Sequence, residues 1–360
     1  MSFRNPSYHP NKATNRYEFD IENMDLAIVN GIRRTILADI PNLGLLGEGD
    51  VTVEIQRNTG PLHNELMAHR ISMIPIHFTE EEVESFTEGD YEFSCSIKNH
   101  EQTIMNVTTK HLQGTRQAVP LSDKELARLF PHNSITNQHV LITRLRPGEE
   151  LAFTAKVIKS TAKEHSSFSP VSLCAFFYHQ DPAKAEDAKG VLDKERAYLK
   201  NKLGDPTSIH FMIEPEEGLS AKYLVAKALE ILLEKIERVH REIDVLDSTY
   251  VRIVASPQME KSYDLHILQE DDTLGNIFQS ILYSHFIREK NKVLENRFTV
   301  SYVGYYTPHP LDPRVVVRMS LQNDSIVPDE KDFAMVMKEC CRHVEREVRK
   351  VYDEWTRFDV

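Results

Sequence analysis

The 360-residue sequence is poor in cysteine, and its four cysteines form no CxxC pair: Cys95, Cys174, Cys340 and Cys341. Because zinc ribbons depend on cysteines paired at such spacings, a zinc ribbon is not encoded. The N-terminal segment also lacks the apolar core of a signal peptide. We therefore expect a protein that is not secreted and that keeps free thiols in a reducing compartment.

Long apolar runs and an excess of basic residues are missing as well. No stretch approaches the about 20 apolar residues that a membrane-spanning helix needs, so no membrane segment is predicted. Lys and Arg number 43 against 55 Asp and Glu, which gives a formal net charge of -12. Since nucleic-acid grooves depend on clustered Lys and Arg, direct sequence-specific nucleic-acid binding is not expected.

The sequence contains no serine nucleophile elbow, no P-loop and no dinucleotide-binding fingerprint. His63, Glu65 and His69 carry groups that can bind a metal, but they lack the HExxH spacing that puts two imidazoles on one helical face. A stand-alone enzyme built on these three residues is one alternative function. A nucleic-acid-binding module is another.

Two long helices give the clearest secondary-structure signal. Over residues 219–243 and 329–355, apolar side chains recur in steps of three and four, which is typical of helices packed lengthwise on a partner helix. Ser220 is the expected N-cap of the first helix. The stripes consist of Val225, Leu229, Leu232, Ile236, Val239 and Ile243, and of Phe333, Met337, Cys340, Val344, Val348, Val351 and Trp355.

A shorter helix is predicted from about Met24 to Ile40, after a strand at residues 17–21. Its apolar face carries Ile28, Ile32, Ile36 and Leu37. The other expected features are a strand at 51–56, a solvated acidic loop at 79–90, a hairpin formed by 140–145 and 151–159, a charged surface insertion at 181–205, and an N-terminal arm that docks late or stays loose.

The most informative pattern is an internal repeat. Residues 27–32 can be aligned with residues 273–278, an offset of 246 positions, and the strand residues before each helix then align as well. Each copy ends in one of the two long helices, and the first copy holds an extra segment of about 120 residues. Gly31 and Gly275 are expected at helix–helix contacts, because no glycine-rich phosphate loop lies beside them.

Two such units would each expose a large apolar stripe in water, so we expect them to pack against each other. The first helix of each unit would face its counterpart, with the long helices alongside. The predicted interface residues are Ile28, Ile32, Ile36, Val225, Leu229, Leu232, Ile236, Leu274, Phe278, Leu282, Met337, Cys340 and Val344.

Five segments resemble a known family. ENMDLAIVNGIRRTILADIP (22–41), HNELMAHRISMIPI (63–76) and residues 144–170 are similar to the third subunit of eukaryotic RNA polymerase II, whose relatives are the archaeal D subunit and the bacterial alpha N-terminal domain. From Leu265 onward, LHILQEDDTLGNIFQSIL and a His-Pro motif at 306–311 resemble the eleventh subunit and archaeal L. A fusion of both resembles the arrangement in large cytoplasmic DNA viruses.

The resemblance implies an α+β fold with two RNA polymerase dimerisation-type units that form an intramolecular pseudo-dimer. The expected domains are a third-subunit-like domain made of residues 1–51 and 173–247, an inserted mainly-β domain at 52–172, and an eleventh-subunit-like domain at 248–360.

The resemblance also implies a non-catalytic assembly-platform role in a DNA-directed RNA polymerase, with one copy per polymerase. Its partners would be the largest and second-largest subunits and small zinc-bearing subunits. A viral fusion would be located in cytoplasmic viral factories and in the virion. Docking of the second-largest subunit, carried over by position, would use Asn30, Arg33, Arg34, Glu65, His69 and Arg70. Alternatively, Arg34 pairs within the chain, for instance with Glu65.

Cellular third subunits often carry a cysteine-rich zinc loop or an iron–sulfur cluster in the inserted domain. The corresponding region here offers only Cys95. We therefore expect no bound metal, no cofactor and no catalytic residue.

Overall fold

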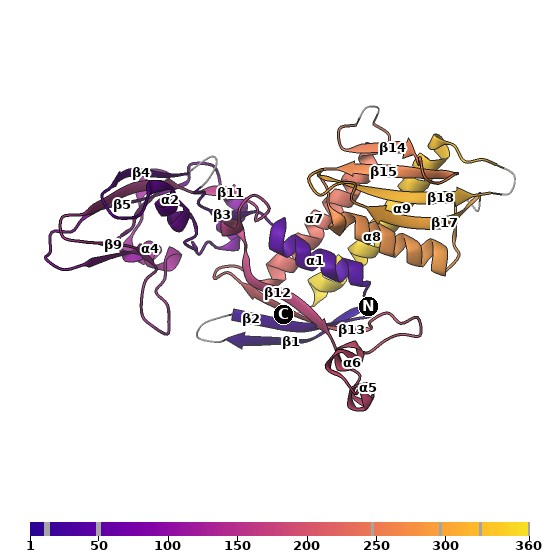
Figure 1. Ribbon diagram of the computed structural model, residues 1–360, viewed down its shortest axis with the longest axis horizontal. Helices are drawn as coiled ribbons and strands as arrows, with labels where there is room; N and C mark the ends of the chain where they lie inside the picture. The colour runs from indigo at the N-terminus through magenta and orange to yellow at the C-terminus, as the bar shows by residue number, and fades with distance from the viewer. Residues whose placement is uncertain (11–14, 48–51, 246–247, 295–296, 324–325, 359–360) are drawn as a thin grey trace.

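Two long helices, α7 (Ala221–Glu242) and α9 (Glu330–Arg357), pack against each other in the middle of the molecule (Figure 1). The computed structural model describes residues 1–10, 15–47, 52–245, 248–294, 297–323 and 326–358. As expected, the Ser220 side chain caps α7 by accepting a hydrogen bond from the Tyr223 backbone N–H. The apolar stripes of both helices are buried, apart from the partly buried Ile243 at the end of α7.

The first unit is a four-stranded antiparallel sheet with order β1-β2-β13-β12, and helices α1 and α7 contact it. Of the two alternatives for the N-terminal arm, docked or loose, the structure shows a docked segment, because the arm forms strand β1. Phe3 on this strand packs edge-on against the Trp355 ring of α9, with ring centroids 4.9 Å apart. The elements are β1 (Ser2–Pro10), β2 (Asn15–Glu22), α1 (Leu26–Ala38), β12 (Val171–Tyr178) and β13 (Ser208–Pro215).

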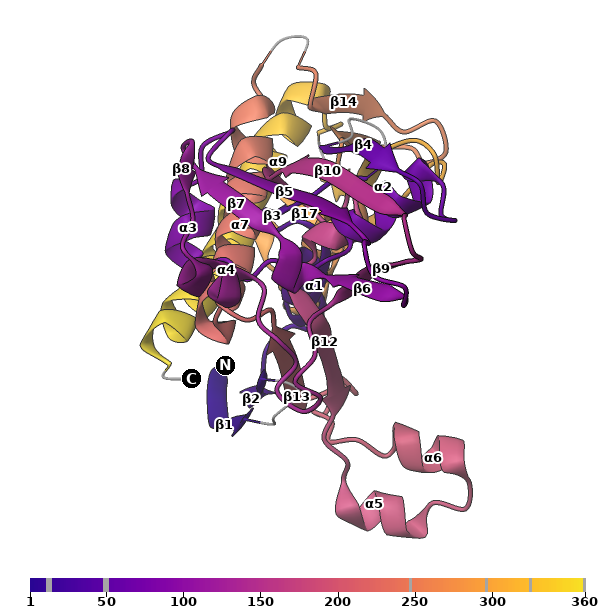
Figure 2. The same cartoon turned by 90° about the vertical axis from the view of Figure 1, so that its left-hand side faces the viewer.

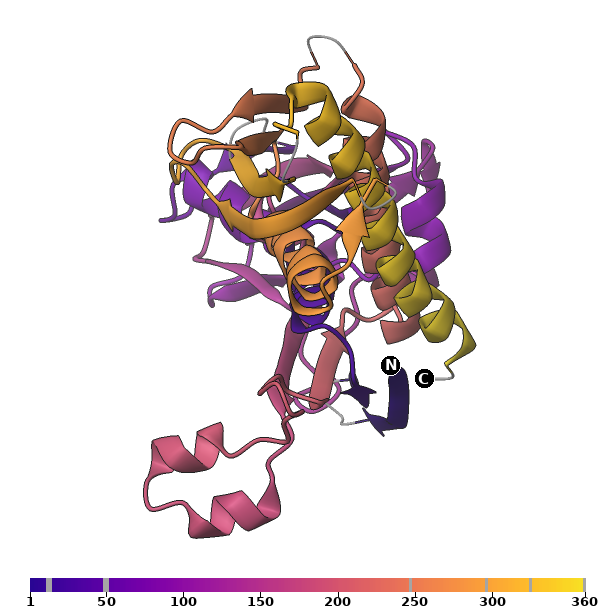
Figure 3. The same cartoon turned by 90° about the vertical axis from the view of Figure 1, so that its right-hand side faces the viewer.

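The second unit has the same order of strand, helix, strands and long helix. Its antiparallel sheet has the order β14-β15-β18-β17-β16, and one hydrophobic core joins it to the first unit. Figure 3 shows this unit from the side, with α9 and α8 against the sheet. The elements are β14 (Val251–Ala255), β15 (Ser262–Leu268), α8 (Asp272–Leu282), a π-helical turn (Tyr283–Arg288), β16 (Lys292–Val293), β17 (Phe298–Tyr306) and β18 (Arg314–Gln322).

The inserted domain has a separate hydrophobic core and a five-stranded sheet with order β4-β10-β5-β7-β8. The strand expected at 51–56 is β4, although Val51 lies outside the described residues. The strands are β3 (Asn42–Gly44), β4 (Val53–Asn58), β5 (Tyr91–Lys98), β6 (Met105–Thr108), β7 (Gln113–Arg116), β8 (Val119–Pro120), β9 (Leu141–Leu145), β10 (Glu150–Lys156) and β11 (Ile158–Ser160). The helices are α2 (Asn64–Ser72), α3 (Glu80–Ser85) and α4 (Asp123–Leu129), with short 3-10 turns at Thr109–His111 and Ser166–Phe168.

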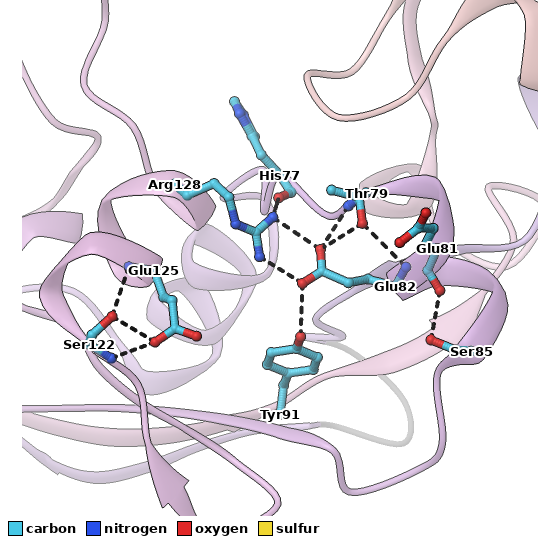
Figure 4. Close-up of polar contacts among 9 residues, drawn as sticks. All are labelled: His77, Thr79, Glu81, Glu82, Ser85, Tyr91, Ser122, Glu125 and Arg128. Carbon is cyan, nitrogen blue, oxygen red and sulfur yellow. Dashed lines mark hydrogen bonds and ion pairs between the residues drawn. The ribbon is translucent and has the colours of Figure 1, made fainter.

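The acidic segment 79–90 was predicted to be a solvated loop, and this is wrong. Thr79 and Glu82 form a capping box that starts α3, and Val83 buries its side chain in the core of the inserted domain. The Glu82 carboxylate also accepts hydrogen bonds from the two terminal guanidinium nitrogens of Arg128, Nη2 at 2.7 Å and Nη1 at 3.0 Å. It accepts a further hydrogen bond from the Tyr91 hydroxyl at 3.1 Å (Figure 4). Reciprocal capping, ion pairing and one buried side chain thus order an otherwise charged segment.

The hairpin predicted around Pro147 and Gly148 is also wrong. The turn exists, with Gly148 in the left-handed region at φ 82°, but the two strands that it joins lie in different sheets. Strand β9 pairs with β6, whereas β10 pairs with β4 and β5. Strong turn residues fix a change of chain direction and do not by themselves select the partner strand.

The charged segment 181–205 forms two short helices, α5 (Pro182–Asp187) and α6 (Val191–Arg196). They project from the ends of β12 and β13, away from the rest of the molecule (Figure 2). This agrees with the expected surface insertion. Among the described residues, no helix combines the length and the hydropathy that crossing a membrane requires.

Candidate functional site: the interface between the two units

The two units meet where α1 and α8 cross. A Cβ atom built on Gly31 of α1 would lie 2.8 Å from Cδ1 of Ile277 and 3.7 Å from a methyl group of Leu232. Any larger residue would therefore push α8 away or displace Ile277, so Gly31 permits the close approach of the two helices. Gly275 was expected to play the same role, and this is wrong: its Cα faces the side chains of Val315 and Tyr305 in the sheet of its own unit.

The ends of α1 and α8 are joined by reciprocal contacts. The Asp25 carboxylate caps α1 and accepts a hydrogen bond from the Ser280 hydroxyl of α8 at 2.8 Å. In the same way, Asp271 caps α8 and lies 3.5 Å from the Arg34 guanidinium of α1, while Arg34 Nε donates to the Thr273 hydroxyl at 2.7 Å.

In the alignment of the two repeats, which are offset by 246 positions, Asp25 corresponds to Asp271 and Arg34 corresponds to Ser280. The two contacts are therefore equivalent under the relation between the units. In an isologous dimer each contact occurs twice, once in each direction across the symmetry axis. The two contacts here follow that pattern. Here both halves belong to one chain.

A buried ion-pair network lies beside this crossing. Lys235 of α7 is 2.8 Å from the Asp39 carboxylate, just after α1, and 3.0 Å from Glu270, just before α8. The Tyr250 hydroxyl donates to Glu270 at 2.9 Å. Burial lowers the pKa of Lys235, but the two neighbouring carboxylates outweigh burial and raise it overall. The lysine is therefore charged and holds three segments together.

Lys163 extends the network to the inserted domain. Its ammonium lies 3.7 Å from the carboxylates of both Asp39 and Asp271. Lys163 lies in the segment 144–170 that carries the family resemblance, but neither it nor Asp39, Lys235 or Glu270 was among the predicted site residues. Lys163 contacts the cap of α8 from a segment that follows β11, so the inserted domain also touches the interface.

The residues predicted for the interface are buried and belong to one continuous core. They come from two helices of each unit, and the inserted domain separates α1 from α7 within the first unit. They are Ile28, Ile32 and Ile36 on α1; Val225, Leu229, Leu232 and Ile236 on α7; Leu274, Phe278 and Leu282 on α8; and Met337, Cys340 and Val344 on α9.

The residues predicted for docking are divided between α1 and α2. Arg34 pairs within the chain, but its partners are Asp271 and Thr273 and not the suggested Glu65. Arg33 is half-buried and donates to the Asn30 side chain at 3.0 Å.

On α2, Arg70 donates to the backbone carbonyls of Leu141 and Ile142. Glu65 is exposed, and the His69 ring contacts the His165 ring with centroids 5.7 Å apart. Within the described ranges, His63, Glu65 and His69 do not form a group able to hold a metal ion.

The region where related subunits carry a cysteine-rich loop does not fit a metal cluster. Cys95 is buried on β5, where burial raises the pKa of its thiol to about 11. A cysteine that binds a metal does so as a thiolate, and no second cysteine lies in the inserted domain.

Comparison with known families decides what the first unit is. Residues 18–236, more than half of the chain, match the RNA polymerase Rpb3/Rpb11 dimerisation domain. The chain belongs to this family. The part of the chain that matches the family begins in β2, includes the inserted domain and ends near the C-terminus of α7.

Curated relatives are RNA polymerase subunits. Human "DNA-directed RNA polymerases I and III subunit RPAC1" is 29% identical over 205 residues, 50% of this chain and 56% of the relative. Arabidopsis thaliana "DNA-directed RNA polymerases II, IV and V subunit 3" is 27% identical over 193 residues, 49% of this chain and 58% of the relative. Schizosaccharomyces pombe "DNA-directed RNA polymerase II subunit RPB3" is 25% identical over 261 residues, 65% of this chain and 86% of the relative. This chain thus spans about half the length of the human and Arabidopsis relatives.

Proposed function

We propose that this protein is a non-catalytic assembly-platform subunit of a multisubunit DNA-directed RNA polymerase, and that it binds the two large subunits as a preformed intramolecular dimer. The observation that carries the proposal is the reciprocal pairing of Asp25 with Ser280 and of Asp271 with Arg34, in a chain of a dimerisation family. The relatives' names as polymerase subunits support it.

The finer proposal is that residues 248–360 correspond to the eleventh subunit and that the chain is a natural fusion of two subunits. The repeated order of elements, with α1 and α7 matched by α8 and α9, supports this view. Residues 1–51 and 173–247 would be the third-subunit-like domain, and 52–172 the inserted domain. Such a fusion resembles the fused subunit of the African swine fever virus polymerase. A viral origin would place the protein in cytoplasmic factories and in virions.

A covalent link has a physical advantage for such a platform. Two separate subunits must overcome the entropy of association before they can bind a third. In one chain the pairing is intramolecular, and its stoichiometry is fixed at one to one. One copy would enter each polymerase and contact the largest and second-largest subunits together with small zinc-bearing subunits.

Affinity purification from the native source, followed by mass spectrometry, tests this function. We expect both large polymerase subunits to copurify in stoichiometric amounts, and the isolated protein to show no nucleotide polymerisation. A preparation that lacks both large subunits would overturn the proposal. An enzymatic activity of the isolated chain, or salt-dependent nucleic-acid binding, would favour the other two classes of function.

A further inference from the structure

The outer face of the β1-β2-β13-β12 sheet carries a group of imidazoles and carboxylates that takes no part in the interface. Asp20 of β2 and His210 of β13 are direct neighbours across the sheet, and His179 follows the last residue of β12. Side chains alternate between the faces of a strand, so these groups lie opposite the buried Phe19 and Phe211. Their exposed fractions are only 15%, 19% and 34% for Asp20, His210 and His179.

Both imidazoles point at the same carboxylate oxygen. Nε2 of His179 lies 2.9 Å from Oδ1 of Asp20, and Nδ1 of His210 lies 2.8 Å from that atom. Within the described part of the chain, this is the trio of His, Cys, Asp or Glu residues whose ligand atoms all lie within 4.8 Å of one another. In a tetrahedral zinc site with bonds of about 2.0 Å, neighbouring ligand atoms are about 3.3 Å apart, so each imidazole nitrogen needs to move roughly half an ångström away from Oδ1.

Neighbouring side chains hold the trio in this orientation. Asn5 of β1 donates to the other Asp20 oxygen, Oδ2, at 2.8 Å and leaves Oδ1 directed at the imidazoles. Nε2 of His210 lies 3.3 Å from a carboxylate oxygen of Glu18. A histidine that binds a metal through one nitrogen commonly donates its other N–H to a carboxylate in this way.

The two contacts of His210 cannot both be hydrogen bonds if its ring is neutral. A neutral imidazole has one N–H, but each ring nitrogen of His210 faces an acidic oxygen. When Nε2–H donates to Glu18, Nδ1 presents its lone pair on the side of Asp20 Oδ1, as the imidazole of a metal ligand does. The second imidazole, His179, converges on the same oxygen, so three potential ligand atoms meet at one point.

We propose that Asp20 Oδ1, His179 Nε2 and His210 Nδ1 bind one divalent transition-metal ion of the zinc class, with Glu18 as the positioning residue for His210. Two imidazoles and one carboxylate are a ligand set that suits zinc, and water completes the coordination.

The place of the site in the fold suggests what the metal does. Strands β12 and β13 carry the projecting segment 181–205 between them, and His179 stands where this segment leaves the sheet (Figure 2). A metal bound to His179 and to Asp20 of β2 would fix the base of the projection to the sheet. The site is independent of the polymerase role, because none of its ligands lies at the α1–α8 crossing.

Zinc binding to the full chain, purified without a polyhistidine tag and stripped with a chelator, tests the proposal. Titration calorimetry with ZnCl₂ should give about one equivalent per chain, and thermal unfolding should move to higher temperature, because an ion that binds only the folded state stabilises it. His179→Ala and His210→Ala should each weaken binding at least 10-fold, and Glu18→Gln should weaken it by about 10-fold to 100-fold. His100→Ala, which changes an exposed histidine in the inserted domain, should leave binding unchanged.

Unfolding in the presence of chelator shows whether each variant keeps the fold, and His179 lies outside the strands, so its replacement leaves the sheet intact. The visible spectrum of Co²⁺ bound to the unmodified chain gives a second readout that needs no variant. It should show nitrogen and oxygen ligation without a thiolate charge-transfer band. Failure of Zn²⁺ and Co²⁺ to bind stoichiometrically overturns the site, as does binding that survives both histidine substitutions.

Discussion

The Ser280 hydroxyl of α8 donates a hydrogen bond to the Asp25 carboxylate, which at the same time caps α1. Its counterpart is the contact of Arg34 with Asp271, the cap of α8. Each helix therefore begins at a carboxylate that also contacts the end of the opposite helix. Each cap is therefore held in place by the opposite unit, so the separate halves would lose the contact that orients each capping carboxylate as well as a buried apolar surface.

The first prediction separates the roles of the two neighbouring arginines. Arg34→Ala removes a hydrogen bond and an ion pair between the units, so the free energy of unfolding should fall by about 1 kcal/mol. Arg33→Ala removes only a contact within α1 to Asn30 and should change stability by less than about 0.5 kcal/mol. Urea denaturation measures both changes.

The same two variants test docking. If Arg33 contacts the second-largest subunit, Arg33→Ala should reduce pulldown of that subunit while the isolated protein stays as stable as before. Equal stability losses in both variants would contradict the assignment of Arg34 as the arginine that joins the units. Unchanged pulldown by a stable Arg33→Ala variant would remove Arg33 from the docking surface.

The second prediction concerns the close approach at Gly31. Gly31→Ala gains up to about 1 kcal/mol in helix propensity but forces a methyl group against Cδ1 of Ile277, at a cost of about 1–3 kcal/mol. Ile277→Val removes the Cδ1 atom that clashes. The double variant should therefore be at least about 0.5 kcal/mol more stable than the sum of the single changes. Urea denaturation of all four proteins measures this coupling, and strict additivity would show that the two residues do not touch.

The sequence reveals the apolar surfaces of this fold better than its polar contacts. Helical stripes such as Val225 to Ile236 are visible because burial imposes a local period of three to four residues. The interaction of Lys235 with Asp39 and Glu270 leaves no such trace, since it joins three segments that are far apart in the chain. The trio of Asp20, His179 and His210 was missed for the same reason: its residues become neighbours only through strand pairing.

Composition alone was a poor guide in two segments. The loop prediction for residues 79–90 weighed the acidic composition and overlooked the Thr79–Glu82 capping box, which is a local signal that the sequence contains. The N-terminal arm was expected either to dock late or to stay loose, because of its Pro, Asn and Ser content. The composition could not decide between the two, because the ring of Phe3 is buried between Phe19 and Trp355, a site that only the folded chain creates.

The third prediction concerns the polar network of the inserted domain shown in Figure 4. Glu82→Ala removes half of the capping box, both hydrogen bonds from Arg128 and the bond from Tyr91. The free energy of unfolding should fall by about 1–3 kcal/mol. Glu81→Ala is the matched control, since Glu81 is exposed in the same helical turn, and it should cost less than about 0.5 kcal/mol. Similar losses in both variants would mean that helix charge, and not the network, stabilises α3.

The fourth prediction follows from Glu216, whose side chain accepts a hydrogen bond from Asn42 at 3.1 Å where the first unit joins the inserted domain. Burial raises the pKa of this carboxyl from 4.5 to about 7, and the Asn42 bond offsets only part of the increase. The folded state therefore binds the proton more tightly than the unfolded state. Below about pH 4.5 the carboxyl is protonated in both states, and its burial then lowers the free energy of unfolding least. As the pH rises from about 4.5 to 7, ionisation of Glu216 lowers the free energy of unfolding progressively.

Glu216→Gln replaces the carboxyl by a neutral group that can still accept the bond from Asn42. The variant should become more stable relative to the unmodified protein by about 1–3 kcal/mol between pH 5 and pH 8, and the difference should level off above pH 8. Urea denaturation of both proteins at several pH values measures this difference. The contributions of other titrating groups, such as the nearby His77 and Glu217 pair, are present in both proteins and largely cancel. Glu88→Gln, at an exposed position of the inserted domain, should give a difference that does not vary with pH. If the Glu216→Gln difference is equally flat, the carboxyl is ionised in the folded protein at pH 5 and its burial does not determine its charge.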